Sequence, residues 1–143
     1  MRATIQALPG SLIRDVANAA MGRPDVLAFW FGESDEVTPQ AVREAAQRSL
    51  RDGETYAHNL GLPALRAAIA GYVGELHVAV DEQRVAVTSS GVTALMLAMQ
   101  MLVGPGDEIV AITPVWPNLT AQPQILGARV RRLPLRAAPR LRA

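Results

Sequence analysis

The stretch from Val87 to Leu95, Val-Thr-Ser-Ser-Gly-Val-Thr-Ala-Leu, is the part of this sequence best suited to chemistry. An apolar run that predicts a strand ends in small polar residues, and a helix is predicted to begin at once. Backbone N–H groups at a helix start lack partners within the helix, and the helix dipole adds positive charge there. The turn therefore favours an anion such as a phosphate, although an ordinary strand-to-helix turn uses the same residue types. The pattern matches neither a dinucleotide-binding glycine motif nor a nucleoside-triphosphate loop with its lysine.

The elements around this turn alternate between strand and helix. Strands are predicted at 84–88, 108–113 and 128–133, with helices at 92–103 and from 116 to about 126 between them. This β-α-β-α-β order favours parallel strands joined by right-handed crossovers, with ligands at the carboxyl ends of the strands. The helix at 92–103 is apolar nearly all round, so we expect it to be buried.

The N-terminal half predicts further elements of an α/β protein. Ser11 is expected to cap a helix that runs to about Met21, and the apolar run 26–31 predicts a buried strand. Thr38-Pro39 predicts the start of a helix that stops at Asp52-Gly53, and another helix follows from Leu62. Residues 134–143 show neither helical nor strand periodicity, and we expect them not to pack.

Composition narrows the class of protein. A chain of 143 residues that is 50% hydrophobic is long enough for one globular domain with a core. It has no cysteine, which excludes disulfides and cysteine-based metal sites, and we expect no metal site. No apolar run reaches the length of a signal peptide core or a membrane span. We therefore expect a cytoplasmic protein.

The basic residues are unevenly placed and all of one kind. Residues 1–108 carry eight arginines and thirteen acids, whereas residues 109–143 carry six arginines and no acid. A basic tail can bind nucleic acid or an anionic membrane. We favour a tail produced where a reading frame has been cut short, because no aromatic residue or binding motif accompanies the arginines. The chain contains no lysine at all.

Four motifs, in order, resemble those of class I aminotransferases, which are fold-type I enzymes dependent on pyridoxal 5'-phosphate (PLP). Residues 32–39 resemble G-E-P-D-x-x-T-P, and residues 56–66 resemble Y-x-x-x-x-G-x-x-x-L-R. Residues 87–95 resemble V-T-x-G-G-x-x-A-L, and residues 105–116 resemble P-G-D-E followed by P-x-W. The resemblance covers residues 5 to about 133 and implies the N-terminal part of the PLP-dependent transferase (aspartate aminotransferase-like) fold. Residues 1–74 would form an N-terminal arm and small-domain segment, and residues 75–133 the start of the PLP-binding large domain.

The resemblance implies roles for individual residues at the cofactor. The backbone N–H groups of Ser90, Gly91 and Val92 would hold the PLP phosphate, with Ser90 standing where the family has a glycine. Trp116 would stack on the pyridine ring. Tyr56 would donate its hydroxyl to the phosphate of the neighbouring subunit, since the family is homodimeric.

Other residues have weaker claims to a role. The backbone N–H of Gly32 would help to hold the substrate carboxylate, or Gly32 is a plain turn. Without the resemblance, Trp116 could equally be a core or surface residue and Tyr56 an interface residue. His58 and His77 lack a recognisable catalytic partner, so we interpret them as loop or surface residues. Asp107 and Glu108 are interpreted as turn and strand-start residues.

Transamination requires an amine that condenses with the PLP aldehyde and then moves protons, and lysine provides it in this family. Arginine cannot replace lysine because its guanidinium stays protonated. The resemblance thus implies the N-terminal part of an aminotransferase for an amino acid and a 2-oxo acid of unspecified side chain, and the missing lysine predicts that this chain is inactive on its own. A non-catalytic remnant that keeps PLP-phosphate binding is the alternative. An aminotransferase-like domain of a transcription regulator is disfavoured, because the match begins within the first residues. With its apolar helix under-covered, the isolated chain is expected to be poorly soluble or partly molten.

Overall fold

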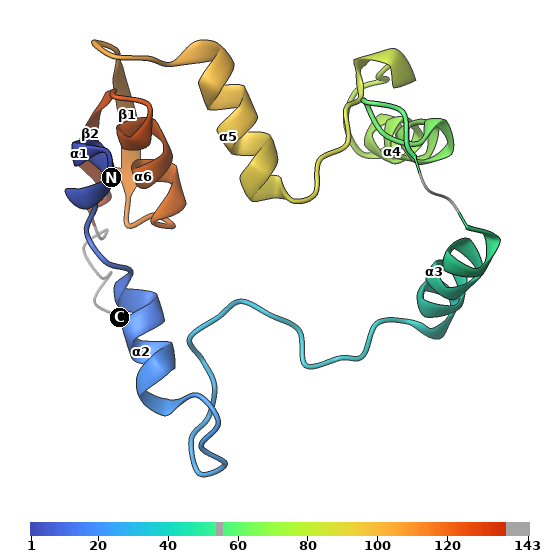
Figure 1. The fold of residues 1–143 in the computed structure, drawn as a ribbon, viewed down its shortest axis with the longest axis horizontal. Coiled ribbons are helices and arrows are strands. Elements are labelled where there is room, and N and C mark those ends of the chain that lie inside the picture. Colours follow the sequence, from blue (N-terminus) through green and yellow to red (C-terminus); the bar gives the residue numbers. More distant parts are fainter. Residues whose placement is uncertain (54–55, 137–143) are drawn as a thin grey trace, which may run out of the picture. The chain divides into compact units, whose positions relative to one another are not determined.

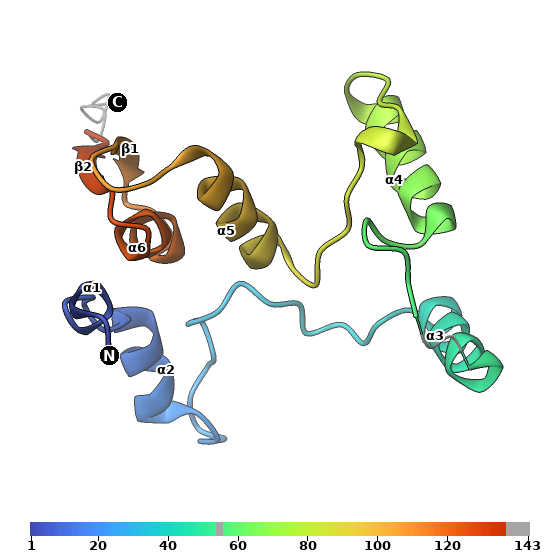
Figure 2. The same ribbon diagram turned by 45° about the horizontal axis from the view of Figure 1, so that its top comes forward.

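The computed structural model describes residues 1–53 and 56–136, and its contacts divide into two compact units. The first unit comprises Met1–Phe31 and Ser90–Ala143, and the second comprises Gly32–Ser89. Each unit is described by itself (Figures 1 and 2).

The first unit is built on two parallel strands, β1 (Glu108–Thr113) and β2 (Arg129–Pro134), in the register Glu108↔Arg129 to Thr113↔Pro134. Helix α6 (Asn118–Ile125) connects them and packs on both strands, as a β-α-β crossover should. Figure 1 shows α1 (Ala3–Gln6) beside α6, where the Arg2 guanidinium donates to the Ile125 carbonyl oxygen at 2.9 Å. The predicted parallel pair is confirmed, with the second strand displaced by one residue.

Two further helices belong to this unit. Helix α2 (Leu12–Ala20) is capped by Ser11, whose hydroxyl accepts from the Arg14 N–H at 3.3 Å, as predicted. Helix α5 (Gly91–Leu102) packs against α6. Apolar burial in the described residues is confined to small side chains, namely Ala17, Ala111 and Ala128, and to Pro123 within α6.

The second unit contains α3 (Gln40–Asp52), α4 (Pro63–Leu76) and the short 3-10 helix η1 (Glu82–Arg84), which packs against α4. Helix α3 ends as predicted, with Gly53 at a φ of +77°. It begins one residue later than expected, since Pro39 occupies the cap position and no side chain caps the helix.

Two predicted strands are wrong. Residues 26–31 form turns and irregular chain, and the segment 84–88 begins within η1 and continues without strand pairing in the described residues. Val85 has the dihedral angles of extended chain, with φ −103° and ψ 124°. A strand requires a neighbour for its N–H and C=O groups as well as an extended backbone, and the two-stranded sheet does not include these segments. The predicted β-α-β-α-β unit is therefore α5-β1-α6-β2 preceded by an unpaired segment.

The C-terminal tail predicted not to pack lies mostly outside the described residues. Of residues 134–143, only 134–136 are described, and Pro134 still belongs to β2. In the part of the chain that the structure describes, no helix is long and apolar enough to cross a membrane.

Candidate functional site

The candidate phosphate-binding turn lies at the N-terminus of α5. Ser90 has extended backbone angles and its hydroxyl accepts from the Thr93 N–H at 3.2 Å, which is the geometry of a helix N-cap. The two hydroxyls of Ser90 and Thr93 lie 3.1 Å apart. The Ser90 side chain therefore satisfies one N–H of the first turn of α5.

The next two N–H groups are placed for an anion. The N–H groups of Gly91 and Val92 have no hydrogen-bond partner among residues 1–53 and 56–136. The first turn contains no acidic residue that would repel a phosphate. A Cβ added to Gly91 would meet nothing within 4 Å, so the space beside this residue is open. The turn thus offers two N–H donors and the positive end of a 12-residue helix.

Trp116 follows β1 and precedes α6, at the carboxyl end of the strand. Its side chain is 46% exposed and lines a pocket of about 390 Å³ together with Arg14, Phe31 and Asn118. The Arg14 guanidinium carbon lies 4.8 Å from the centre of the Phe31 ring, so a cation is stacked on an aromatic wall of this pocket. A half-exposed indole in such a pocket can serve as a platform for a flat ring.

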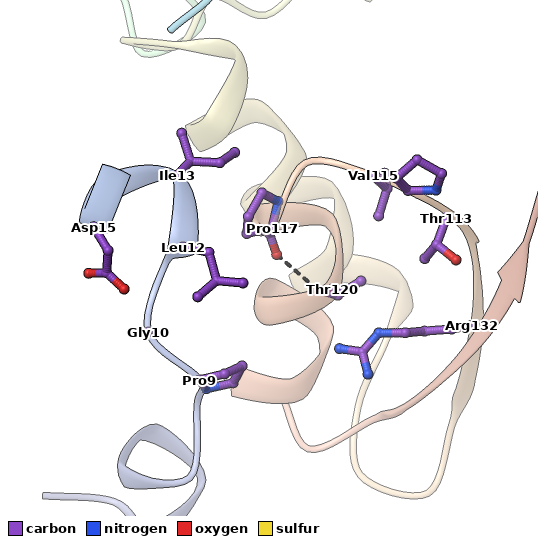
Figure 3. A pocket seen from close by; sticks show the side chains of 11 residues that line it. Pro9, Gly10, Leu12, Ile13, Asp15, Thr113, Val115, Pro117, Thr120 and Arg132 are labelled. Atoms are coloured by element: carbon purple, nitrogen blue, oxygen red, sulfur yellow. Dashed lines mark hydrogen bonds between the residues drawn. The ribbon is translucent and has the colours of Figure 1, made fainter. Parts of the chain in front are cut away.

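A second pocket, of about 670 Å³, lies at the same end of β1 (Figure 3). Leu12 and Ile13 of α2 form one wall, and the residues that follow β1 form another. Arg132 of β2 points into it, and in the described part of the chain its guanidinium makes no ion pair or hydrogen bond. In the sequence, Arg132 belongs to the predicted strand 128–133 and to the basic tail, and no motif marks it as a site residue. Alternation along the strand would have assigned it to a face, but not to a pocket built with α2.

The two helices that carry the candidate site are joined by Gln122 of α6. This side chain is 6% exposed, and its Nε2 donates to the Val92 carbonyl oxygen at 3.1 Å. No motif in the sequence marks Gln122, because a single glutamine in a helix has no distinctive pattern.

The motif at 56–66 has a structural role in the second unit that sequence analysis did not assign. The Val87 N–H donates to the Leu60 carbonyl oxygen at 2.9 Å, and Gly61, with a φ of +102°, lies against the Val87 side chain. The Arg66 guanidinium donates to the carbonyl oxygens of Val85 at 2.9 Å and Glu82 at 2.8 Å. These contacts hold the segment that leads directly into the turn at Ser90.

Tyr56 and Gly32 also belong to the second unit. The Tyr56 side chain is 96% exposed, and a Cβ added to Gly32 would meet nothing within 4 Å. Their assigned roles, at a neighbouring subunit's phosphate and at a substrate carboxylate, stay predictions.

The histidines and the acidic pair do not form a catalytic group. The His58 Nδ1 accepts from the Leu60 N–H at 3.2 Å, within the loop where it was predicted. Asp107 accepts from the Gly104 N–H at 2.8 Å, which confirms its interpretation as a turn residue, and Glu108 pairs with Arg131 at 3.3 Å. Within the described ranges, no three His, Asp or Glu residues are grouped to hold a metal ion.

Comparison with known proteins places this geometry in a family. The sequence profile of the family "Aminotransferase class I and II" matches residues 25–142. The aspartate aminotransferase of Pyrococcus horikoshii is 31% identical over 128 residues, which are 88% of this chain and 33% of that protein. The aspartate/prephenate aminotransferase of Thermus thermophilus is 36% identical over 108 residues, which are 74% of this chain and 28% of that protein.

Solved structures agree. The aspartate aminotransferase of Thermus thermophilus with maleate has a TM-score of 0.86 and 30% identity, over 94% of this chain and 37% of that one. The enzyme of Thermotoga maritima has a TM-score of 0.83 and 31% identity, over 94% and 37%. The chain spans about a third of the length of these curated relatives. It belongs to the class I and II aminotransferase family.

Proposed function

We propose that this chain corresponds to the N-terminal part of a PLP-dependent aminotransferase, which transfers an amino group between an amino acid and a 2-oxo acid. The observation that carries the proposal is the combination, within one unit, of the Gly91 and Val92 N–H groups, which have no partner in the described residues, and a half-exposed Trp116 after β1. Membership of the family supports the same function. The named relatives act on aspartate, so aspartate is the first amino donor to assay.

The residues of the first unit fit the cofactor. The N–H groups of Gly91 and Val92 would bind the phosphate with that of Ser90, and Trp116 would stack on the pyridine ring. When bound, PLP supplies an electron sink for chemistry at the substrate α-carbon. Tyr56 of a second copy and the Gly32 N–H would complete the site in a cytoplasmic homodimer. In that enzyme residues 1–74 would belong to the arm and small domain, and residues 75–133 to the large domain.

The chain cannot complete this chemistry alone. It contains no lysine, so no side chain provides the amine that attaches to PLP and moves the substrate proton. Arginine cannot do so, since its guanidinium has no free lone pair. This absence favours a second candidate function, a non-catalytic chain that binds PLP reversibly through the first turn of α5.

Re-sequencing the gene, with translation beyond the codon for Ala143 in all three frames, separates the two candidates. We expect one frame to continue with an asparagine-proline segment, an aspartate and a lysine at the family's spacing. The arginine-rich tail would then result from a frameshift. If all three frames lack these residues, the proposed catalytic function is wrong, and reversible PLP binding is the candidate function that remains.

Borohydride treatment tests the missing lysine directly on the purified chain. Borohydride fixes PLP permanently on amines, and here the terminal amine is the one amine in the sequence. Without borohydride, we expect PLP to bind and to be removed fully by dialysis. After reduction, peptide mapping should find attached PLP at Met1 or at no residue. PLP fixed at any internal position would contradict this expectation.

A further inference from the structure

Gln122 is a buried polar residue whose position the motifs do not explain. It lies in α6 beside Pro123 and is 6% exposed. Among the described residues, it is the one polar residue that is buried. Burying a carboxamide costs free energy unless its N–H and C=O groups are hydrogen-bonded, so a buried glutamine is expected to have a hydrogen-bond partner.

The orientation of the Gln122 side chain is determined by its partner. Its Nε2 lies 3.1 Å from the Val92 carbonyl oxygen. A carbonyl oxygen can only accept, so the amide must present its N–H end there. The Oε1 at the other end is buried and has no partner within the described residues. Within the described residues, the bond donated to α5 is therefore the hydrogen bond that this buried side chain makes.

That bond joins the two halves of the candidate site. Val92 is in the first turn of α5, where the N–H donors lie. Gln122 is one turn into α6, and the first turn of α6 is tied to Trp116, because the Leu119 N–H donates to the Trp116 carbonyl oxygen at 3.0 Å. A rigid ligand bound by its phosphate and its ring requires these two elements at a constant spacing.

We propose that Gln122 is a positioning residue that sets the spacing between the phosphate-binding turn of α5 and the Trp116 platform. The inference rests on the proposed PLP site and adds to it a residue that touches neither the phosphate nor the ring. Ligands that use both elements at once depend on this spacing, whereas a ligand that uses the turn alone does not.

The test compares two probes, PLP and inorganic phosphate, on the 143-residue chain. A Trp30→Phe background leaves Trp116 as the fluorophore whose quenching reports PLP binding, and phosphate is measured by ³¹P NMR. Gln122→Met removes the donor and keeps a side chain of similar length. We expect its Kd for PLP to rise by up to about tenfold, because without the bond from Gln122 to Val92 the two elements are no longer held at the spacing that PLP needs. Its Kd for phosphate should change less than about twofold, since phosphate does not bridge the two elements.

The control is Gln100→Met, the same substitution at an exposed position of α5, which should leave both constants unchanged. Circular dichroism verifies that each variant retains its helices. If Gln122→Met does not fold, Gln122→Glu replaces it, because a glutamate side chain has a similar size and, when ionised, no N–H donor. The same ratio of the Kd values for PLP and phosphate is then measured.

Each outcome decides a different point. If Gln122→Met weakens the binding of PLP and of phosphate equally, Gln122 only supports the turn. If the Kd for PLP does not change, Gln122 has no part in PLP binding. Either result overturns the inference. If the background protein binds phosphate but not PLP, the proposed PLP site itself fails, and the inference fails with it.

Discussion

Gly61 lies where the loop at 56–62 approaches the segment that leads into the phosphate-binding turn. Its φ of +102° is a conformation that side chains rarely adopt, and an added Cβ would lie 2.6 Å from the Val87 Cβ. We predict that Gly61→Ala destabilises this packing by about 1–3 kcal/mol. Hydrogen exchange at the Val87 N–H, which donates to the Leu60 carbonyl oxygen, should accelerate accordingly.

Gly71→Ala is the matched control for that substitution. Gly71 lies inside α4, lacks a positive φ, and has nothing within 4 Å of an added Cβ. Alanine should therefore stabilise α4 by about 0.5–1 kcal/mol. Equal effects at Gly61 and Gly71 would contradict the close approach.

The ion pair of Arg23 and Asp25 gives a prediction about pH. The Arg23 guanidinium, 2.6 Å from the Asp25 carboxylate, lowers the pKa of that carboxyl below its ordinary value, with help from a backbone hydrogen bond. A lowered pKa in the folded chain stabilises it above a pH of about 4, and this contribution is lost as the pH falls through the lowered pKa. Both side chains are more than half exposed, so salt should weaken the effect.

Carboxyl ¹³C NMR titration checks this expectation. Arg23→Gln should raise the pKa of Asp25 toward its ordinary value, whereas Arg48→Gln, on α3, should leave it unchanged. An Asp25 pKa that does not respond to Arg23→Gln would show that the pair is not formed in solution.

At the scale of elements, Arg66 connects α4 to η1 and to Val85, the residue after it. One guanidinium donates to two carbonyl oxygens, those of Glu82 and Val85, and both bonds are charge-assisted. We predict that Arg66→Lys costs about 1.5–3 kcal/mol, because a compact ammonium cannot reproduce the fork. Exchange at the N–H groups of Arg84 and Val85, both bonded within η1, should accelerate.

Arg43→Lys controls for the substitution itself. Arg43 is exposed on α3, and its side chain makes no recorded bond in the described residues. If both variants exchange alike, the bridge from Arg66 does not hold η1.

Elements whose signals are local were predicted well from the sequence. Ser11 and Gly53 mark helix ends through their own side chain or backbone, and both lie where predicted. Strand 108–113 was predicted to the residue, since a short apolar run directly after a glycine-rich turn defines it. The segments 26–31 and 84–88 were predicted as strands from apolar composition, but pairing depends on a neighbour that composition does not reveal.

The candidate site divides in the same way. The start of a helix at Ser90, Gly91 and Val92 indicates an anion-binding turn by itself, whereas the role of Trp116 was implied only by the family resemblance. The hydrogen bonds that Gln122 and Arg66 donate could not be predicted from the sequence. Gln122 donates to the carbonyl oxygen of Val92, 30 positions away, and Arg66 to that of Val85, 19 positions away. Tertiary bonds to a backbone carbonyl have no sequence signal on the acceptor side.

At the scale of the whole molecule, helix α5 leaves large apolar side chains exposed. It was expected to be buried, yet Leu97 is 48%, Met101 81% and Leu102 79% exposed. The apolar side chains that are buried among the described residues are small, so the hydrophobic contribution to folding is correspondingly small.

We predict that the isolated chain is poorly soluble or partly molten, with ANS binding and a broad thermal transition. Met101→Gln with Leu102→Gln should lower ANS binding and raise solubility, because exposed substitutions change stability by less than about 0.5 kcal/mol. Val110→Gln, an exposed residue of β1, is the comparison outside α5 and should have less effect. Calorimetry decides the matter, since a sharp, cooperative transition of the purified monomer requires a packed core. That result would mean that the apolar face of α5 is covered in solution by contacts within the chain.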